Sequence, residues 1–132
     1  MAQMGSNNSI EVNRGDMLPL TFKHKDRITG EFYTFKKDDV VRFKIMEKGD
    51  CSKVILQKDE KVNEETESVQ MIIPSDDMKI GPILSKPVDY WYEVELNPDT
   101  SHTVTILGFT KAGGAKILTL TPEGGDKDES IQ

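Results

Sequence analysis

The sequence predicts an all-β protein, a single β-sandwich of about eight short strands, and three observations lead to that prediction. Apolar and polar residues alternate in short runs, which is the period of a half-buried strand. Turn-forming Gly, Pro, Asn and Asp separate these runs at intervals of ~8–12 residues. No long segment has the helical period, and no internal repeat or linker divides the chain.

The ordered domain is predicted to span residues 9–122. Residues 1–8 and 123–132 contain almost no core-forming side chains, so we expect a disordered N-terminus and a disordered acidic tail. The middle of the domain remains long enough to bury one core.

The centre of that core is expected in a strand–turn–strand unit over 82–109, which holds the only Trp. Its first strand, 90–96, alternates strictly, and Tyr90 and Tyr92 are expected to face inward. Asn, Pro and Asp at 97–100 supply the turn, since Pro fixes φ and the other two bond to nearby backbone.

The other strands follow from the same alternation. Pro19 lies within one of them, and because Pro cannot donate to a ladder that strand is expected at a sheet edge. The charged run 59–67 reads as a solvated connection, and its flanking strands are further edge candidates. Residues 75–78 suit a single helical turn. The expected strands are 8–12, 18–22, 40–46, 53–58, 68–73, 90–96, 103–109 and 116–120.

Charge and composition argue against several classes of partner. The net charge of −6 is unsuited to nucleic acid, whose phosphates require clustered Lys and Arg, and to a polybasic membrane contact. The one cysteine, Cys51, cannot form an intrachain disulfide. The N-terminus lacks the charged and apolar regions of a signal peptide, so we expect synthesis in the cytoplasm.

No stretch predicts catalytic chemistry, so we expect a protein that is not an enzyme, with no catalytic, cofactor-binding or metal-ligating residues. His24 and His102 are the only histidines and lack the spacing of a metal pair. The segment 108–116 resembles a phosphate-binding loop only superficially, because no Ser or Thr follows its Lys. Arg14-Gly15-Asp16 matches an adhesion tripeptide, although Gly-Asp before an apolar run is ordinary turn chemistry.

Trp91, Glu93 and Glu95 are the candidate interaction surface. They alternate with the expected core residues and therefore share one face of the strand. An exposed Trp91 beside two carboxylates would be a platform for stacking a sugar or an anchor for a protein partner. The other interpretation is the solvent-facing side of a half-buried strand.

The order of these landmarks resembles small prophage tail and baseplate proteins of Gram-positive bacteria, in particular the N-terminal domain of phage baseplate upper proteins. Those proteins share an order of landmarks: a Gly-Asp turn, a V-x-F-x-I strand, a lysine-ended strand, a Y-x-Y-(D/E)-V-x-L strand and a closing strand. In this chain these landmarks lie at 14–16, 39–45, 54–58, 90–96 and 118–123, and the stretches 18–22, 72–77, 84 and 103–108 lie between them in the same order.

The resemblance implies an immunoglobulin-like antiparallel β-sandwich of about eight strands. It also implies a non-catalytic structural component of a (pro)phage tail or baseplate, made in the bacterial cytoplasm and located in the virion tail. Such a module would bind other tail or baseplate proteins and copies of itself. The alternative function is a carbohydrate-binding sandwich module of a phage adhesion device, with a glycan on Trp91.

Overall fold

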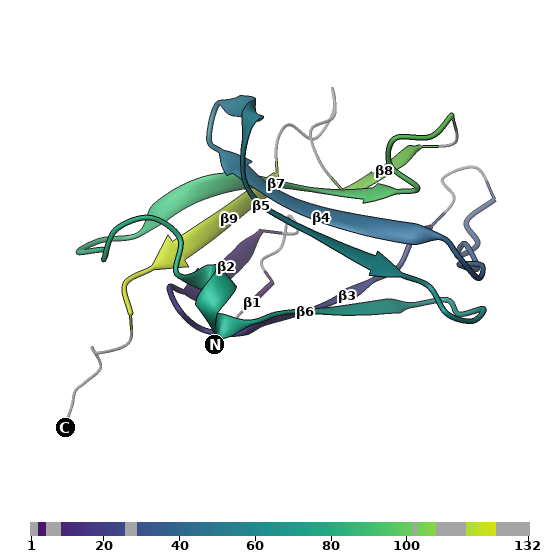
Figure 1. The fold of residues 1–132 in the computed structure, drawn as a ribbon, viewed down its shortest axis with the longest axis horizontal. Coiled ribbons are helices and arrows are strands. Elements are labelled where there is room, and N and C mark those ends of the chain that lie inside the picture. Colours follow the sequence, from purple (N-terminus) through teal and green to yellow (C-terminus); the bar gives the residue numbers. More distant parts are fainter. Residues whose placement is uncertain (1–2, 5–8, 26–28, 102, 108–115, 124–132) are drawn as a thin grey trace.

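The computed structural model describes residues 3–4, 9–25, 29–101, 103–107 and 116–123, and these form a sandwich of one large and one small sheet (Figure 1). The prediction of an all-β sandwich is confirmed. The described strands are β1 (Gln3–Met4), β2 (Ile10–Asn13), β3 (Leu18–Phe22), β4 (Val40–Glu47), β5 (Asp50–Lys61), β6 (Val69–Ile73), β7 (Val88–Leu96), β8 (Val104–Leu107) and β9 (Lys116–Thr121). A 3₁₀ turn, η1 (Ser75–Met78), follows β6.

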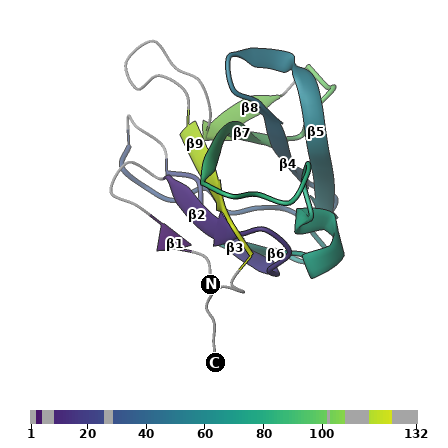
Figure 2. The same ribbon diagram turned by 90° about the vertical axis from the view of Figure 1, so that its left-hand side faces the viewer.

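The large sheet, here called sheet A, has the strand order β1-β2-β9-β7-β4-β5, and β8 pairs with the end of β7. The small sheet, sheet B, consists of β3 and β6. In Figure 1, β3 and β6 lie below β4, β5 and β7 of sheet A, and Figure 2 shows β2 and β9 of the same sheet along one side. Pro19 therefore lies in an edge strand, as predicted, and it stands opposite Ile72 in the β3–β6 ladder.

Two details correct the expected topology. The sandwich is not purely antiparallel, because β2 pairs with β9 in parallel, from Ile10 opposite Leu118 to Asn13 opposite Thr121. The first eight residues, expected to be disordered, include the short strand β1, whose Met4 stands opposite Ile10. Both corrections involve β2, which pairs with β9 along one edge and with β1 along the other.

The core lies between the two sheets and is built by the alternation that the sequence displays. Tyr92 is 1% exposed and tilts against Phe43, with 5.8 Å between the ring centroids. Phe43 in turn stacks on Phe22 of sheet B across 6.4 Å. The inward orientation predicted for Tyr92 is thus confirmed, and Tyr90 packs at the margin of the same core.

β7 is the central strand of the fold. It pairs with β4 along its length, from Val41 opposite Leu96 to Glu47 opposite Tyr90. On its other side the first half pairs with β9 and the second half with β8. The outward residues Trp91, Glu93 and Glu95 of β7 consequently have neighbours on the same face of β4.

Candidate functional site

The outer face of sheet A carries all three candidate residues. Trp91, Glu93 and Glu95 alternate with the buried residues of β7 and are themselves partly exposed. Trp91 lies between Met46 of β4 and Ile117 of β9 in the ladder. Met46 is only 3% exposed although it points away from the core, because Trp91 and Val54 flank it. Trp91 is therefore part of a small apolar patch and not an isolated flat platform.

Glu93 and Glu95 share one cation, Lys44 of β4. The ammonium of Lys44 lies 3.0 Å from a carboxylate oxygen of Glu93 and 3.3 Å from one of Glu95. Burial of the ammonium lowers the pKa of Lys44, but the bonds and charges of the two carboxylates outweigh that effect and raise the pKa above its usual value. The group is a triad with two negative charges and one positive charge.

Arg42, two residues earlier on β4, is held in the same way. Its guanidinium donates to both carboxylate oxygens of Asp59 on β5, at 2.8 and 3.1 Å, and to Asp99 at 3.0 Å. These hydrogen bonds raise the pKa of Arg42 above its usual value. We call these two groups the anionic triads: Lys44 with Glu93 and Glu95, and Arg42 with Asp59 and Asp99. Each has a net charge of −1.

Lys44 and Arg42 are not among the surface residues predicted from the sequence. The signal was present, since two basic residues alternate outward on 40–46 and two acidic ones on 90–96. It becomes a prediction only when β4 and β7 are known to be neighbours.

A second surface, the basic hairpin, has arms at 23–25 and 32–34. Lys25 and Phe32 form an antiparallel bridge, and Tyr33 donates its backbone N–H to the His24 carbonyl at 2.7 Å. The ammonium groups of Lys23 and Lys25 lie 5.3 and 5.7 Å from the centre of the Phe32 ring. Phe32 remains 46% exposed, which makes it an exposed aromatic residue between two cations.

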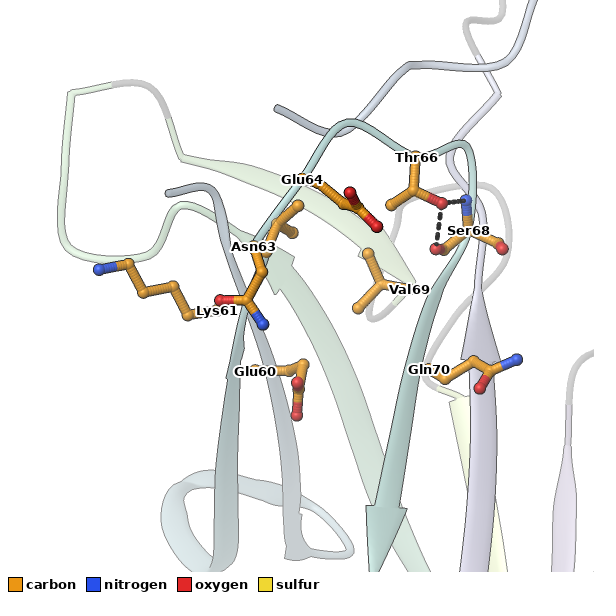
Figure 3. A pocket seen from close by; sticks show the side chains of 9 residues that line it. Glu60, Lys61, Asn63, Glu64, Thr66, Ser68, Val69 and Gln70 are labelled. Carbon is orange, nitrogen blue, oxygen red and sulfur yellow. Dashed lines mark hydrogen bonds between the residues drawn. The ribbon is translucent and has the colours of Figure 1, made fainter. Parts of the chain in front are cut away.

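The third surface is the open side of the sandwich between β5 and β6. Figure 3 shows a cleft here, with Glu60 on one strand and Gln70 on the other, and its volume is about 460 Å³. Within the described chain β5 pairs only with β4 and β6 only with β3, so both strands present an unpaired edge to this side. β5 also exposes Ile55, by 41%.

The base of the basic hairpin is fixed by Asp39. Its carboxylate accepts hydrogen bonds from the Tyr33 hydroxyl at 2.7 Å, the Lys36 backbone N–H at 2.9 Å and the Asn97 amide at 3.2 Å. Burial raises the pKa of Asp39, but these bonds prevail and hold it below its usual value. Burial and the bond to Asp39 raise the pKa of Tyr33 to about 12.

The Arg14-Gly15-Asp16 tripeptide has a structural role. The Arg14 guanidinium donates to the carbonyls of Ile80 at 3.1 Å and Gly81 at 2.7 Å and also bonds Glu123. Gly15 adopts φ +86°, a conformation that suits glycine at this turn. With its guanidinium engaged in this way, Arg14 is not presented for recognition by an adhesion receptor.

The described residues contain no group of three or more His, Cys, Asp and Glu side chains placed to hold a metal ion. In the same part of the chain no helix is long and apolar enough to cross a membrane. His102 and residues 108–115, which include most of the loop compared with a phosphate-binding loop, lie outside the described residues, as do 124–132 of the acidic tail.

Together the fold and these surfaces define an all-β sandwich domain with two charged surfaces of opposite sign and one open side. Comparison of the chain with protein-family models, curated proteins and solved structures found no match.

Proposed function

We propose that this chain is a non-catalytic structural component of a (pro)phage tail or baseplate that acts by protein–protein assembly. The observation that supports assembly most directly is the open side of the sandwich, where β5 and β6 both present unpaired edges beside a cleft. An extended segment from another protein can add to such an edge through backbone hydrogen bonds.

The edge of β5 is protected against indiscriminate pairing. It carries Lys53, Lys58 and Lys61. Its ladder with β4 is also irregular, because Leu56 pairs with Ile45 and Val54 with Met46, which leaves Ile55 between them without a partner in that ladder. Charged side chains and bulges of this kind discourage aggregation at an edge. The combination supports a selective contact with a partner that matches this strand.

The immunoglobulin-like class is part of the proposal. The order β9-β7-β4-β5 in sheet A, opposed by the pair β3-β6, corresponds to strands G-F-C-C′ opposed by B and E of a variable-type immunoglobulin sandwich. The phage assignment itself rests on the resemblance of the ordered strand pattern to baseplate upper proteins. Other tail proteins or copies of the chain would then be its partners.

The carbohydrate-binding alternative has less support. A sugar-stacking residue presents a flat open face, whereas Trp91 is half-buried among apolar neighbours. The carboxylates of Glu93 and Glu95, which would bond sugar hydroxyls, already bind Lys44.

Mass spectrometry of phage particles purified after prophage induction tests the proposal. We expect peptides of this chain in the particles at tens of copies, because tail structures repeat their components by symmetry. A cytoplasmic protein of similar abundance serves as the control for contamination. If this chain is depleted from the particles to the same extent as that control, the proposed function is wrong.

A further inference from the structure

We infer that two of these surfaces bind each other between copies: the basic hairpin of one chain docks on the anionic outer face of sheet A of the next. This inference rests on the proposed function, because it names a second copy of the chain as one assembly partner. It concerns a different surface from the open β5–β6 side.

The outer face of sheet A attracts a cationic partner. Each of its two central cations, Lys44 and Arg42, is shared by two carboxylates, so each anionic triad retains a net negative charge. Asp99 in particular is 79% exposed at the rim. The field of such a face favours approach of positive groups and opposes approach of an identical face.

The basic hairpin has the complementary charge. The ammonium groups of Lys23 and Lys25 both lie close to one Phe32 ring, where each is attracted by the ring but repelled by the other cation. Carboxylates of a partner would relieve that repulsion. The described hairpin residues carry two lysines, Lys23 and Lys25, and one acid, Glu31, so this part is positive in a chain whose net charge is −6.

The apolar parts of the two surfaces also match. Phe32 exposes nearly half its surface between the two lysines. On the outer face of sheet A, Val54 is exposed beside Met46 and Trp91, on the same face as the triads. An aromatic side chain flanked by cations thus fits an apolar patch neighboured by carboxylates, as in an interface with an anchor and a charged rim.

The symmetry of this contact follows from its two halves being different patches. A contact of the hairpin with the outer face joins two copies head to tail. Repeated from copy to copy it forms a closed ring or a filament, and exchanged reciprocally between two copies it forms a two-fold dimer. Contact between two outer faces is disfavoured, because both are anionic. The inference therefore predicts association that weakens with salt.

Sedimentation velocity of the full chain measures this association. We expect concentration-dependent oligomers at low ionic strength that dissociate as salt is raised through the range where surface charges are screened. The hairpin variant Lys23→Glu/Lys25→Glu should weaken self-association by about tenfold or more. The matched control Lys37→Glu/Lys86→Glu makes the same change in net charge away from the hairpin arms and should retain it.

Mixing two defective variants tests the head-to-tail geometry. The face variant Glu93→Gln/Glu95→Gln keeps an intact hairpin, and the hairpin variant keeps an intact face. At a concentration where the wild type associates, each variant alone should be largely monomeric, whereas a mixture should form a 1:1 heterodimer that does not grow, since only one functional contact remains. Asp99 is exposed and adopts a positive φ of 62°, which Asn also tolerates. Asp99→Asn should therefore weaken association while the chain still folds. Thermal unfolding of each variant verifies that it is folded.

Three results would overturn the inference: a wild-type chain that stays monomeric at low salt, a hairpin variant that associates like its control, or a mixture of folded variants that forms no heterodimer. None of them would affect the proposed function, because a tail component can assemble through the β5–β6 side or with other proteins. Absence from phage particles would count against the proposed function and leave the solution measurements unchanged.

Discussion

The ammonium of Lys44 lies 3.0 Å from a carboxylate oxygen of Glu93, directly across the β4–β7 ladder. Glu95, two residues further along β7, bonds the same ammonium. The contact joins the two central strands of sheet A on the face opposite the core. It also contributes to the negative charge of that face, because a single cation serves two acids.

Replacement of Lys44 by Met should destabilise the fold by about 1 kcal/mol, since it leaves two neighbouring carboxylates without their cation. Lys44→Arg, which keeps the positive charge, is the matched control and should lose less. Chemical denaturation measures both free energies of unfolding. Equal stability of Lys44→Met and the wild type would mean that solvent already screens the triad.

Tyr92→Ala should cost ~3–5 kcal/mol, because it removes a large, fully buried side chain from the contact between β7 and Phe43. Tyr90→Ala, at the margin of the core, should cost clearly less. Urea unfolding of the two variants provides the comparison. If Tyr90→Ala is the more destabilising change, Tyr92 does not lie deeper in the core than Tyr90.

Much of this core is predictable from the sequence, because strict alternation identifies β3, β4, β6 and β7 and places Tyr92 inward. β5 was predicted too short, as 53–58. It is an edge strand with mostly exposed side chains, and the residues it gains, 50–52 and 59–61, are mostly polar or charged. No apolar alternation therefore marks its full length, and the charged run 59–67, expected to be a connection, begins within the strand.

The arrangement of the strands is less predictable than the strands themselves. The parallel pairing of β2 with β9 joins residues more than a hundred positions apart, as in Ile10 with Leu118. The anionic triads depend on equally long-range neighbours. The sequence placed Glu93 and Glu95 on one face but contained no information about which strand lies beside them.

Asp39 should make the free energy of unfolding depend on pH in the acidic range. Its pKa is held below the ordinary 3.8, so its contribution is present above that value and is lost as the pH falls through the lower pKa of the folded state. Asp39→Asn should be destabilising near neutral pH by about 1–2 kcal/mol, because an amide cannot accept all three hydrogen bonds. The difference between the two proteins should shrink below pH ~4. Denaturation at several pH values tests this, and a constant difference would contradict it.

Tyr33 and Tyr92 should make the fold sensitive to alkali. Burial raises the pKa of both phenols from 10.0 to about 12, with a further contribution from Asp39 at Tyr33. A raised pKa means that the neutral form is favoured in the folded state. Its stabilisation is therefore complete below pH 10 and is lost as the pH rises toward 12. Ultraviolet titration should reveal two late-ionising tyrosines, and Tyr33→Phe should remove one of them.

Arg14→Ala should destabilise the chain by about 1 kcal/mol, since the carbonyls of Ile80 and Gly81 lose their donor. Arg14→Lys should recover only part of the loss, because one ammonium does not reproduce the geometry of the guanidinium. Thermal unfolding distinguishes the variants. A stable Arg14→Ala protein would show that these contacts are dispensable and would restore interest in the tripeptide as a recognition motif.

Deletion of the gene from the prophage, followed by electron microscopy of the induced particles, tests whether this chain is a structural component of the tail. We expect particles with an absent or incomplete tail or baseplate, and restoration of that structure when the wild-type chain is supplied in trans. Complete, infectious particles without this chain would contradict it.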